Sequence, residues 1–502
     1  MQAKLEQLKT RLQEVSDYQA AAALLSWDQA TYMPPGGAVA RGRQLSLLSQ
    51  VAQEKFTDPV IGRLLDDLQP YADGLPYDDD DAALIRATRR AYERQVKVPP
   101  ALVGEIANHT TQSYQVWTQA RPQNDFAAMA PYLTQTIDLS RRLADCFPGY
   151  AHIADPLIDL ADYGMRAESV RALFAELRAQ LAPLVKQVTE QDSADDSCLK
   201  QDFPVDQQRP FGEAIIRDFG YDFERGRQDL TIHPFATKFS IGDVRITTRF
   251  NPRHIGEGLF GTLHESGHAM YEQGVTPAYE GTPLDGGVSA GIHESQSRTW
   301  ENLVGRSRPF WEHYYPRLQA LFPEQLGRVS LDTFYRAINK VQRSLIRVEA
   351  DQLTYDLHVM IRFDLELALL EGTLTVQELP EAWHARYTAD LGGCAPNDSD
   401  GVLQDVHWYA GLVGGAFQGY TLGNILSAAF FEQAQTVHPT ISADIARGHF
   451  APLHGWLKDN IYRHGSKYTA PELIQRVLGG PLTVAPYLRY LKGKFGELYT
   501  LT

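Results

Sequence analysis

The sequence predicts a mainly α-helical fold that contains one small β-hairpin. Three observations predict it. Apolar residues recur at helical spacing along most of the 502 residues, long strand-like runs are scarce, and no internal repeat of roughly 20 to 50 residues indicates a solenoid. A chain of this length with 43% hydrophobic residues can bury a large core. We expect residues 1–502 to form a single unit.

The predicted helices share apolar positions three or four residues apart, with charged residues between them. They cover residues 5–23, 51–68, 82–95, 127–143, 169–190, 331–368 and 443–460. An acidic run, residues 78–81, comes just before the third of these helices. Because carboxylates are favoured at the positive end of a helix dipole, we interpret this run as a solvated helix start.

The predicted hairpin comprises residues 233–240 and 244–250, which flank a turn at 241–243 that contains glycine. Alternation of polar and apolar residues places Arg245 and Arg249 on the same face of the second strand, opposite a half-buried apolar face. Two arginines on one strand are ordinary surface charge in most proteins. Beside a metal site they would be candidates for holding a carboxylate.

After the hairpin comes His264-Glu265-Ser266-Gly267-His268, in a stretch whose apolar spacing is helical and which can stop at Gly274. Two histidines four residues apart point the same way on a helix and can bind one metal ion. We therefore predict His264 and His268 as zinc ligands and Glu265 as the general base that accepts a proton from the attacking water. The alternative is a helix that merely carries two histidines.

A second helix is expected to begin near His293-Glu294, after the glycine-rich segment 285–287. Catalytic zinc commonly takes two histidines and one carboxylate, so we predict Glu294 as the third ligand. Without the neighbouring motifs, Glu294 could equally be an exposed acid at a helix start. Glu301, seven residues later on the same helical face, is a candidate acceptor for one of the ligand histidines.

Residues 408–431 carry no charge, and glycines recur within them at positions 411, 415, 419 and 423. The segment is long enough to span a bilayer, and small residues every four positions are typical of membrane helix packing. However, Gln418, Asn424 and the glycines dilute its hydrophobicity. We therefore interpret it as buried polypeptide packed closely beside the active site.

Composition excludes several classes of partner. Lys and Arg total 47 against 62 Asp and Glu, and the net charge of −15 argues against nucleic acid or an anionic membrane as the main partner. The three cysteines, Cys146, Cys198 and Cys394, show no paired spacing, which is typical of a reducing compartment. Residues 1–14 lack the apolar core of a leader peptide. We expect a cytoplasmic protein.

The predicted site has the composition needed for amide hydrolysis. A metal ion on two histidines and a glutamate would polarise the scissile carbonyl, and Glu265 could pass its proton on to the departing amine. The oxyanion that forms needs further donors, for which His407 and Tyr420 are candidates. Read from their residue types alone, His407 and Tyr420 could instead be core residues with satisfied hydrogen bonds.

Several separate stretches resemble the carboxypeptidase Taq family of zinc metallocarboxypeptidases. They occur in the family's order between about positions 27 and 424, and comprise residues 27–37, His-Pro-Phe at 233–235, Asp-x-Arg-x-Thr at 243–247, the motif at 264–268, residues 293–297, residues 346–351 and Gly-x-x-Gln-Asp-x-His-Trp at 401–408. Ala30, where relatives often have glutamate, is a departure outside the expected site. The combination is far more specific than any single motif.

The resemblance implies a large helical zinc-peptidase fold, in which helical halves flank a deep groove within one catalytic unit. It places the metal ligands at His264, His268 and Glu294 and the general base at Glu265, in agreement with the reasoning from residue types. It further implies one zinc ion per chain, for which cobalt could substitute, and a homodimer.

The resemblance also implies that the groove is closed at one end by motifs that meet the substrate's C-terminus. His233, Arg245, Gln404 and His407 are the residues expected there. Arg347 is another candidate carboxylate partner, although an ion pair with Glu349 or Asp351 would be a structural alternative.

A groove that stops one residue beyond the scissile bond admits only peptides with a free C-terminus and removes one residue at a time. Broad side-chain preference, with proline disfavoured, is expected from the family. Two other functions remain open at this point. One is an endopeptidase or oligopeptidase with an open groove, and the other is a catalytically silent peptide-binding scaffold, against which the intact Glu265 argues.

Overall fold

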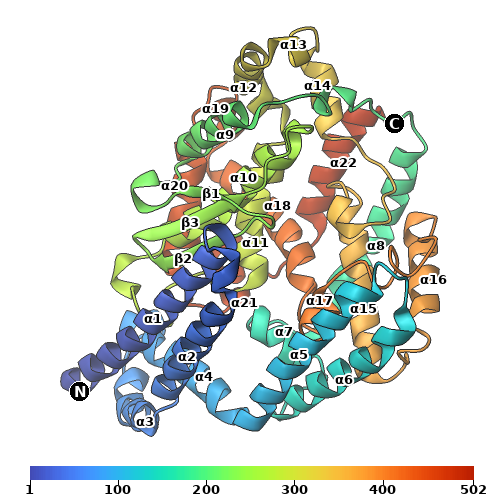
Figure 1. The fold of residues 1–502 in the computed structure, drawn as a ribbon. Coiled ribbons are helices and arrows are strands. Elements are labelled where there is room, and N and C mark those ends of the chain that lie inside the picture. The colour runs from blue at the N-terminus through green and yellow to red at the C-terminus, as the bar shows by residue number, and fades with distance from the viewer. Residues whose placement is uncertain (502) are drawn as a thin grey trace.

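The computed structural model describes residues 1–501 and consists mainly of α-helices around one small sheet, which confirms the predicted fold class (Figure 1). The first half contains α1 (Gln2–Thr31), α2 (Ala38–Phe56), α3 (Pro59–Asp73), α4 (Asp80–Lys97), α5 (Pro100–Ala120), α6 (Phe126–Asp145), α7 (Asp155–Ala161), α8 (Ala167–Thr189), α9 (Val205–Phe219), β1 (Gln228–Leu230), β2 (Ala236–Ser240) and β3 (Asp243–Thr248). The second half contains α10 (Ile255–Gln273), α11 (Ala290–Arg298), α12 (Arg308–Leu321), α13 (Pro323–Leu326), α14 (Leu331–Ile338), α15 (Tyr355–Glu371), α16 (Leu379–Leu391), α17 (His407–Ala410), α18 (Gln418–Val437), α19 (Ile441–Ile445), α20 (Ala451–Asn460), α21 (Ala470–Leu478) and α22 (Ala485–Tyr499).

The predicted hairpin is confirmed as β2 and β3, which pair antiparallel with Lys238 opposite Val244. A register irregularity follows between Lys238 and Ser240. The sheet has a third strand that the sequence did not predict, because β1 is only three residues long. β1 pairs parallel with β3, with Gln228 opposite Ile246, and the strand order is β1-β3-β2.

Three predicted helices are wrong in extent. The helix expected over 51–68 is divided between α2 and α3, because Asp58 caps α3 by accepting a hydrogen bond from the backbone N–H of Val60. The helix expected over 331–368 ends at Ile338 and resumes only at α15. The one expected over 443–460 breaks into α19 and α20 around Gly448, whose φ of +71° is incompatible with a helix.

The break after α14 has an identifiable cause in Asp351. Its carboxylate accepts hydrogen bonds from the backbone N–H groups of Gln342, Leu353 and Thr354. A side chain that satisfies backbone donors in this way competes with helical hydrogen bonding. The irregular segment 339–354 that results carries Arg347, one of the predicted site residues.

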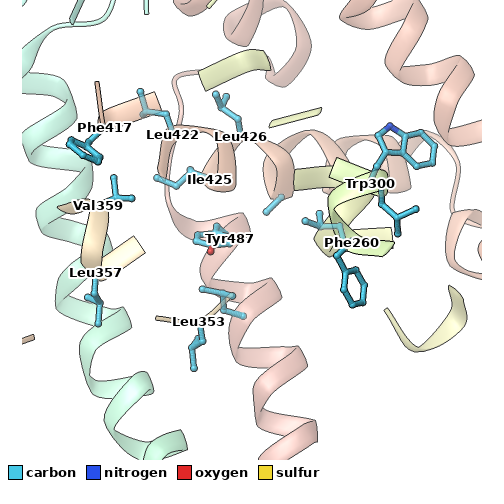
Figure 2. Packing of buried hydrophobic residues seen from close by; sticks show 14 of the residues in the cluster. Phe260, Trp300, Leu353, Leu357, Val359, Phe417, Leu422, Ile425, Leu426 and Tyr487 are labelled. Carbon is cyan, nitrogen blue, oxygen red and sulfur yellow. The ribbon is translucent and has the colours of Figure 1, made fainter. Parts of the chain in front are cut away.

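Two hydrophobic clusters hold the molecule together. The larger one includes the buried faces of α8, α10, α15, α18 and α22, and Figure 2 shows Leu422, Ile425 and Leu426 of α18 close to Tyr487 of α22. The smaller one is formed by leucines and other apolar residues of α1, α3 and α4, such as Leu5 and Leu65. They pack with four residues from later in the chain: Ile241, Val275, Tyr279 and Leu284. We call residues 1–97 the N-terminal arm, drawn in blue in Figure 1.

The glycine-rich segment 408–431 packs closely beside the expected site, as predicted. Gly419 and Gly423 lie on α18, and a Cβ atom on Gly423 would come within 2.5 Å of Cγ of Glu294. Gly411 and Gly415 lie before the helix begins. Within residues 1–501, no helix is both long and apolar enough to cross a membrane.

Candidate metal centre and active site

The motif helix is α10, which begins after His254 and ends before Gly274, the predicted stop. His254 caps it by accepting a hydrogen bond from the backbone N–H of Gly256. Gly267, inside the motif, allows α11 to come close, because a Cβ there would lie 2.5 Å from the carbonyl oxygen of Gln296. This close approach brings Glu294 of α11 to the two motif histidines.

His264, His268 and Glu294 form a cluster that could hold a metal ion. Each offers one donor atom, and these atoms all lie within 4.8 Å of one another. Oε2 of Glu294 is 3.8 Å from Nε2 of His264 and 3.5 Å from Nε2 of His268. Ligand atoms about 2.0 to 2.2 Å from a tetrahedral zinc ion lie roughly 3.3 to 3.6 Å apart. The 3.5 Å distance lies within this range and the 3.8 Å distance slightly beyond it, and the donor types are those that zinc takes.

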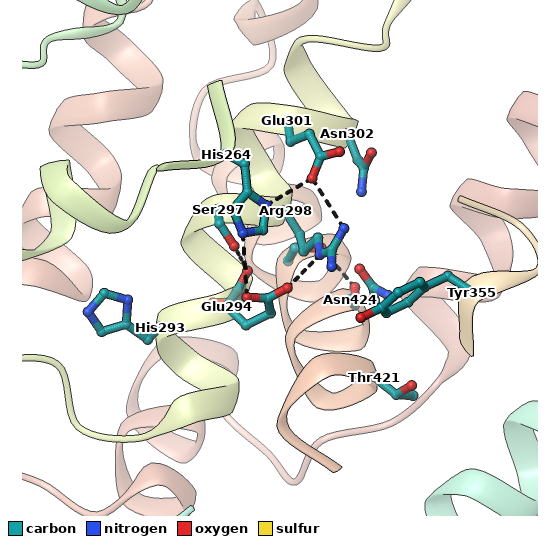
Figure 3. Close-up of polar contacts among 12 residues, drawn as sticks. His264, His293, Glu294, Ser297, Arg298, Glu301, Asn302, Tyr355, Thr421 and Asn424 are labelled. Carbon is teal, nitrogen blue, oxygen red and sulfur yellow. Dashed lines mark hydrogen bonds and ion pairs between the residues drawn. The ribbon is translucent and has the colours of Figure 1, made fainter. Parts of the chain in front are cut away.

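Two further residues of the same segment hold these ligands (Figure 3). Nδ1 of His264 donates to Oε2 of Glu301 at 2.9 Å, so the expected acceptor is confirmed as a contact. Arg298 bridges the cluster by donating from Nε to Oε1 of Glu294 at 2.7 Å and from Nη1 to Oε2 of Glu301 at 3.2 Å. Oε1 of Glu294 is thereby occupied, which leaves Oε2 to face the histidines. Glu301 lies in a π-helical turn, Thr299–Val304, a feature often found at functional sites.

Burial and charge set the protonation states at this centre. Burial alone would raise the pKa of Glu294, but Arg298 and the two histidines outweigh it and hold the pKa well below its usual range. Burial lowers the pKa of His268 to about 4, which keeps the imidazole neutral, as a metal ligand must be. Burial raises the pKa of Glu265 to about 7, helped by the nearby charges of Glu294 and Glu301. An ordinary acid becomes a group able to take and return a proton near neutral pH.

A cavity of about 310 Å³ lies beside the centre, at the N-terminal half of α10. Glu301 and Arg306 line this cavity and also a smaller one of about 90 Å³, which Arg298 and Tyr355 help to line. Nη2 of Arg306 donates to Oε1 of Glu301 at 3.1 Å. Charged side chains of both signs therefore contribute to the lining of the open space near the proposed metal ligands.

His407 and Tyr420, the predicted oxyanion donors, are brought together. Nε2 of His407 lies 3.3 Å from the hydroxyl of Tyr420, and Nδ1 lies 3.2 Å from Oδ1 of Asp405. The ring of Tyr420 is 6.3 Å from that of Tyr355, over which the guanidinium of Arg298 lies at 4.9 Å. A short series of side chains therefore links the pair to the metal ligands.

Arg347 is buried and paired, but its partner is Asp405 rather than Glu349 or Asp351. Nε and Nη2 of Arg347 donate to the two carboxylate oxygens of Asp405 at 2.6 and 2.7 Å. Nη1 donates to the hydroxyl of Tyr355 at 3.0 Å. A guanidinium has five N–H groups, so two remain for another acceptor.

Gln404 is fully engaged by the protein. Its Nε2 donates to the carbonyl oxygens of Leu345 and Asp400 at 3.0 and 2.6 Å. Its Oε1 accepts from the backbone N–H of Arg347 at 2.9 Å and from Nη2 of Arg362 at 2.8 Å. Gln404 therefore shapes this end of the site by holding Arg347 in place.

Arg245 and His233 lie apart from that group. Arg245 donates to its neighbour Asp243 at 2.8 and 2.7 Å, and its guanidinium lies 4.4 Å from the ring of Trp27 in the N-terminal arm and 4.9 Å from that of Phe239. His233 is exposed in the loop before β2. Among the residues described, no hydrogen bond or ion pair joins either residue to Arg347 or Gln404.

The sequence reasoning missed three charged residues of the site: Arg298, Arg362 and Asp405. Arg298 had a readable signal, because it follows Glu294 by four residues in a predicted helix, which is the spacing of a helical ion pair. Asp405 lies inside a recognised motif, but its partners are distant in sequence. Arg362 is completely buried on α15 and had no local signal.

Comparisons with known proteins agree along the whole chain. The carboxypeptidase Taq (M32) metallopeptidase family matches residues 7–495. The chain is 42% identical over 491 residues to thermostable carboxypeptidase 1 of Thermus thermophilus, with 95% of each chain covered, and 37% identical to carboxypeptidase 1 of Bacillus subtilis, with 98% and 97% covered. The crystal structure of M32 carboxypeptidase from Deinococcus radiodurans R1 is similar, with a TM-score of 0.97, 50% identity, and 99% and 100% of the two chains covered.

Proposed function

The chain belongs to the carboxypeptidase Taq (M32) family and is a metallocarboxypeptidase, and from this premise we propose that it releases single C-terminal amino acids from peptides with zinc bound by His264, His268 and Glu294. The observation that carries the ligand assignment is the convergence of three donor atoms within 4.8 Å. One ion per chain at this point would supply the Lewis acidity that polarises the scissile carbonyl and acidifies the attacking water. Cobalt could substitute for zinc in the same donor set.

We assign proton transfer to Glu265. Glu265 follows His264 directly in the chain, and its side chain is buried. Its pKa of about 7 suits a group that must accept and then donate a proton. It would take the proton of the attacking water and return it to the departing amine. His407 and Tyr420 are assigned as donors to the negative charge that develops on the carbonyl oxygen. The assignment is supported by their 3.3 Å contact, which places the two polar groups side by side.

We assign recognition of the C-terminal carboxylate to Arg347, supported by Gln404, and extend the assignment to His233 and Arg245, which lie apart from these two residues. Arg347 is supported by its two uncommitted N–H groups and by its contact with Tyr355, which links it to Arg298 beside the metal ligands. Gln404 supports this end by holding the backbone of Arg347. The assignments of His233 and Arg245 rest on the family motifs that contain them.

Further properties belong to the same proposal. We infer broad side-chain preference with proline disfavoured next to the scissile bond, a single catalytic unit over residues 1–502, a homodimer, and a cytoplasmic location in keeping with three unpaired cysteines. The oligomeric state can be checked by light scattering during size-exclusion chromatography.

The function is tested with one peptide and its C-terminally amidated twin, followed by mass spectrometry over time with and without a zinc chelator. We expect a ladder of products that shortens from the C-terminus, only for the free peptide and only when metal is present. Internal cuts in both peptides would contradict carboxylate recognition and indicate an endopeptidase. A ladder that persists in the chelator would contradict the metal assignment.

A further inference from the structure

We propose that His293 is a positioning residue for the metal centre: it fixes the proton of His268 on Nδ1 and so directs the Nε2 lone pair of His268 at the metal. This inference rests on the proposed ligand set. His293 is next to the proposed ligand Glu294 in the chain, but its side chain contacts His268.

The contacts form a continuous series behind His268. Nδ1 of His268 lies 2.6 Å from Nδ1 of His293, and Nε2 of His293 lies 2.8 Å from Oε1 of Glu272. Oε2 of Glu272 accepts from Nζ of Lys238 at 3.1 Å, and Lys238 also pairs with Asp285. The series therefore runs from the motif helix through the start of α11 to strand β2.

Counting protons along this series leaves one arrangement. A ligand histidine that offers Nε2 to a metal must carry its proton on Nδ1, so Nδ1 of His268 is the donor in the 2.6 Å contact. Nδ1 of His293 is then the acceptor, and the proton of His293 must be on Nε2. Glu272 fixes that proton, because a carboxylate held by Lys238 can only accept.

The two ligand histidines are thus supported by different chemistry. His264 donates directly to a carboxylate, that of Glu301. His268 donates to a neutral ring, which could serve equally well as a donor or an acceptor if nothing else constrained it. Glu272 removes this ambiguity, which explains why a second residue is needed behind His293 but not behind Glu301.

The surroundings of His293 are built to hold one ring orientation. A Cβ atom on Gly287 would lie 2.5 Å from Cδ2 of His293, so only glycine leaves room for the ring. The backbone N–H of Gly287 donates to the same Oε1 of Glu272 that faces His293, at 3.0 Å. The ring of Tyr271 lies 5.1 Å away, tilted against that of His293.

The experiment measures zinc affinity by competition with a chelating dye. Removing a group that orients a metal ligand lowers metal affinity about 10- to 100-fold, and we expect His293→Leu to show that loss. His293→Asn should lose less, because its amide oxygen can replace Nδ1 as the acceptor. Gly287→Ala keeps His293 but displaces its ring, and should weaken zinc binding in the same direction.

Controls separate positioning from folding and from the ligand assignment. Gly261→Ala is a matched control on the same helix, since its added Cβ meets nothing within 4 Å, and it should leave zinc affinity unchanged. Thermal unfolding of each metal-free variant shows whether it is folded before zinc is added. The nitrogen shifts of ¹⁵N-labelled histidine in the zinc-loaded protein should show His268 protonated on Nδ1 in the wild type.

Two results would overturn the inference. Zinc affinity of folded His293→Leu within about twofold of the wild type would remove the positioning role of His293 while the ligand set stood. Zinc binding that survives His264→Ala would remove the ligand set itself, and the inference with it. Activity is not needed to distinguish these results, because both are read from metal binding.

Discussion

The metal centre and the group around Arg347 differ in how their polar atoms are matched. At the proposed metal centre, Nε2 of His264 and Nε2 of His268 lie 3.8 and 3.5 Å from Oε2 of Glu294, so three potential ligand atoms converge. We call Arg347, Arg362, Gln404, Asp405 and His407 the recognition cluster. There, most donors have an acceptor within the protein, and two N–H groups of Arg347 remain for a ligand. Converging ligand atoms suit a bound cation. A network of matched hydrogen bonds instead holds its side chains in place, so that a substrate carboxylate can bind at its edge.

This difference has a consequence for how each region can be disrupted. A change at the metal centre should act on chemistry or metal content and leave the fold intact. A change in the recognition cluster should also leave a buried partner unmatched, because Asp405 is shared by both arginines.

The largest effect is expected from Glu265→Gln at the metal centre. Glutamine has nearly the same shape but cannot accept the proton of the attacking water, so kcat should fall by about 10²- to 10⁴-fold. Zinc content, measured by atomic emission, should stay at one ion per chain, because Glu265 is not among the three ligands. A variant that keeps more than a tenth of wild-type turnover would remove Glu265 from proton transfer.

Arg347→Met in the recognition cluster should have the next largest effect. Loss of a charged hydrogen bond to the substrate carboxylate costs about 1.5 to 3 kcal/mol, which lowers kcat/KM for a free C-terminus roughly 10- to 150-fold. The thermal midpoint should fall as well, because Asp405 loses two of its donors. Arg347→Lys should restore the charge but not both bonds to Asp405.

Kinetics distinguish the two roles weighed for Arg347. A lower melting temperature with unchanged kcat/KM would mean that Arg347 serves only as a structural ion pair. Zinc content should be normal in either case, since no contact joins Arg347 to a metal ligand among the residues described.

The same comparison explains which features could be predicted from the sequence. His264, His268 and Glu301 could be predicted because helical spacing fixes which side chains share a face. Glu294 could be proposed because catalytic zinc commonly takes two histidines and one carboxylate, and because a second helix was expected to begin there. The recognition cluster was not readable in this way, because Arg347 and Asp405 meet only through the tertiary fold. Arg347, Gln404 and His407 were proposed for this end from a family resemblance, whereas Arg362, Asp405 and the contacts among all five became known only from the structure.

The wrong helix boundaries have a similar origin. Residues 331–368 have helical spacing of apolar residues, but the carboxylate of Asp351 takes the backbone donors that a helix would use. The resulting irregular segment places Arg347 where it can reach Asp405. Local periodicity contains no information about contacts between residues distant in sequence. The predicted helix was therefore wrong at the irregular segment that positions Arg347.

Arg245→Ala tests whether the sheet belongs to the recognition end. We expect kcat/KM for free C-termini to fall about fivefold, corresponding to roughly 1 kcal/mol, because Arg245 is already paired with Asp243 and partly stacked on Trp27. Arg249→Ala is the matched control, since Arg249 is exposed just after the same strand. Equal kinetics for both variants would exclude Arg245 from carboxylate binding.

The smallest effect on turnover is expected at Glu366, beneath the recognition cluster, where the change acts on stability. Its side chain is fully buried and accepts a hydrogen bond from Nε1 of Trp408 at 2.9 Å, and burial raises its pKa from 4.5 to about 7. A folded-state pKa above the unfolded value means that the native state binds its proton more tightly. The contribution of Glu366 therefore lowers the free energy of unfolding progressively as pH rises from about 4.5 to about 7. Above that range the loss is constant.

Glu366→Gln cannot ionise and still offers an oxygen to Trp408, so it should be more stable than the wild type at pH 8 by up to roughly 3 kcal/mol. At pH 5, where the native wild type is protonated, most of this advantage should disappear. Thermal midpoints of both proteins at the two pH values measure the difference, with exposed Glu381→Gln as the control. The same shift at both pH values would mean that Glu366 is ionised in the native state, and that the recognition cluster rests on a buried charge rather than a neutral acid.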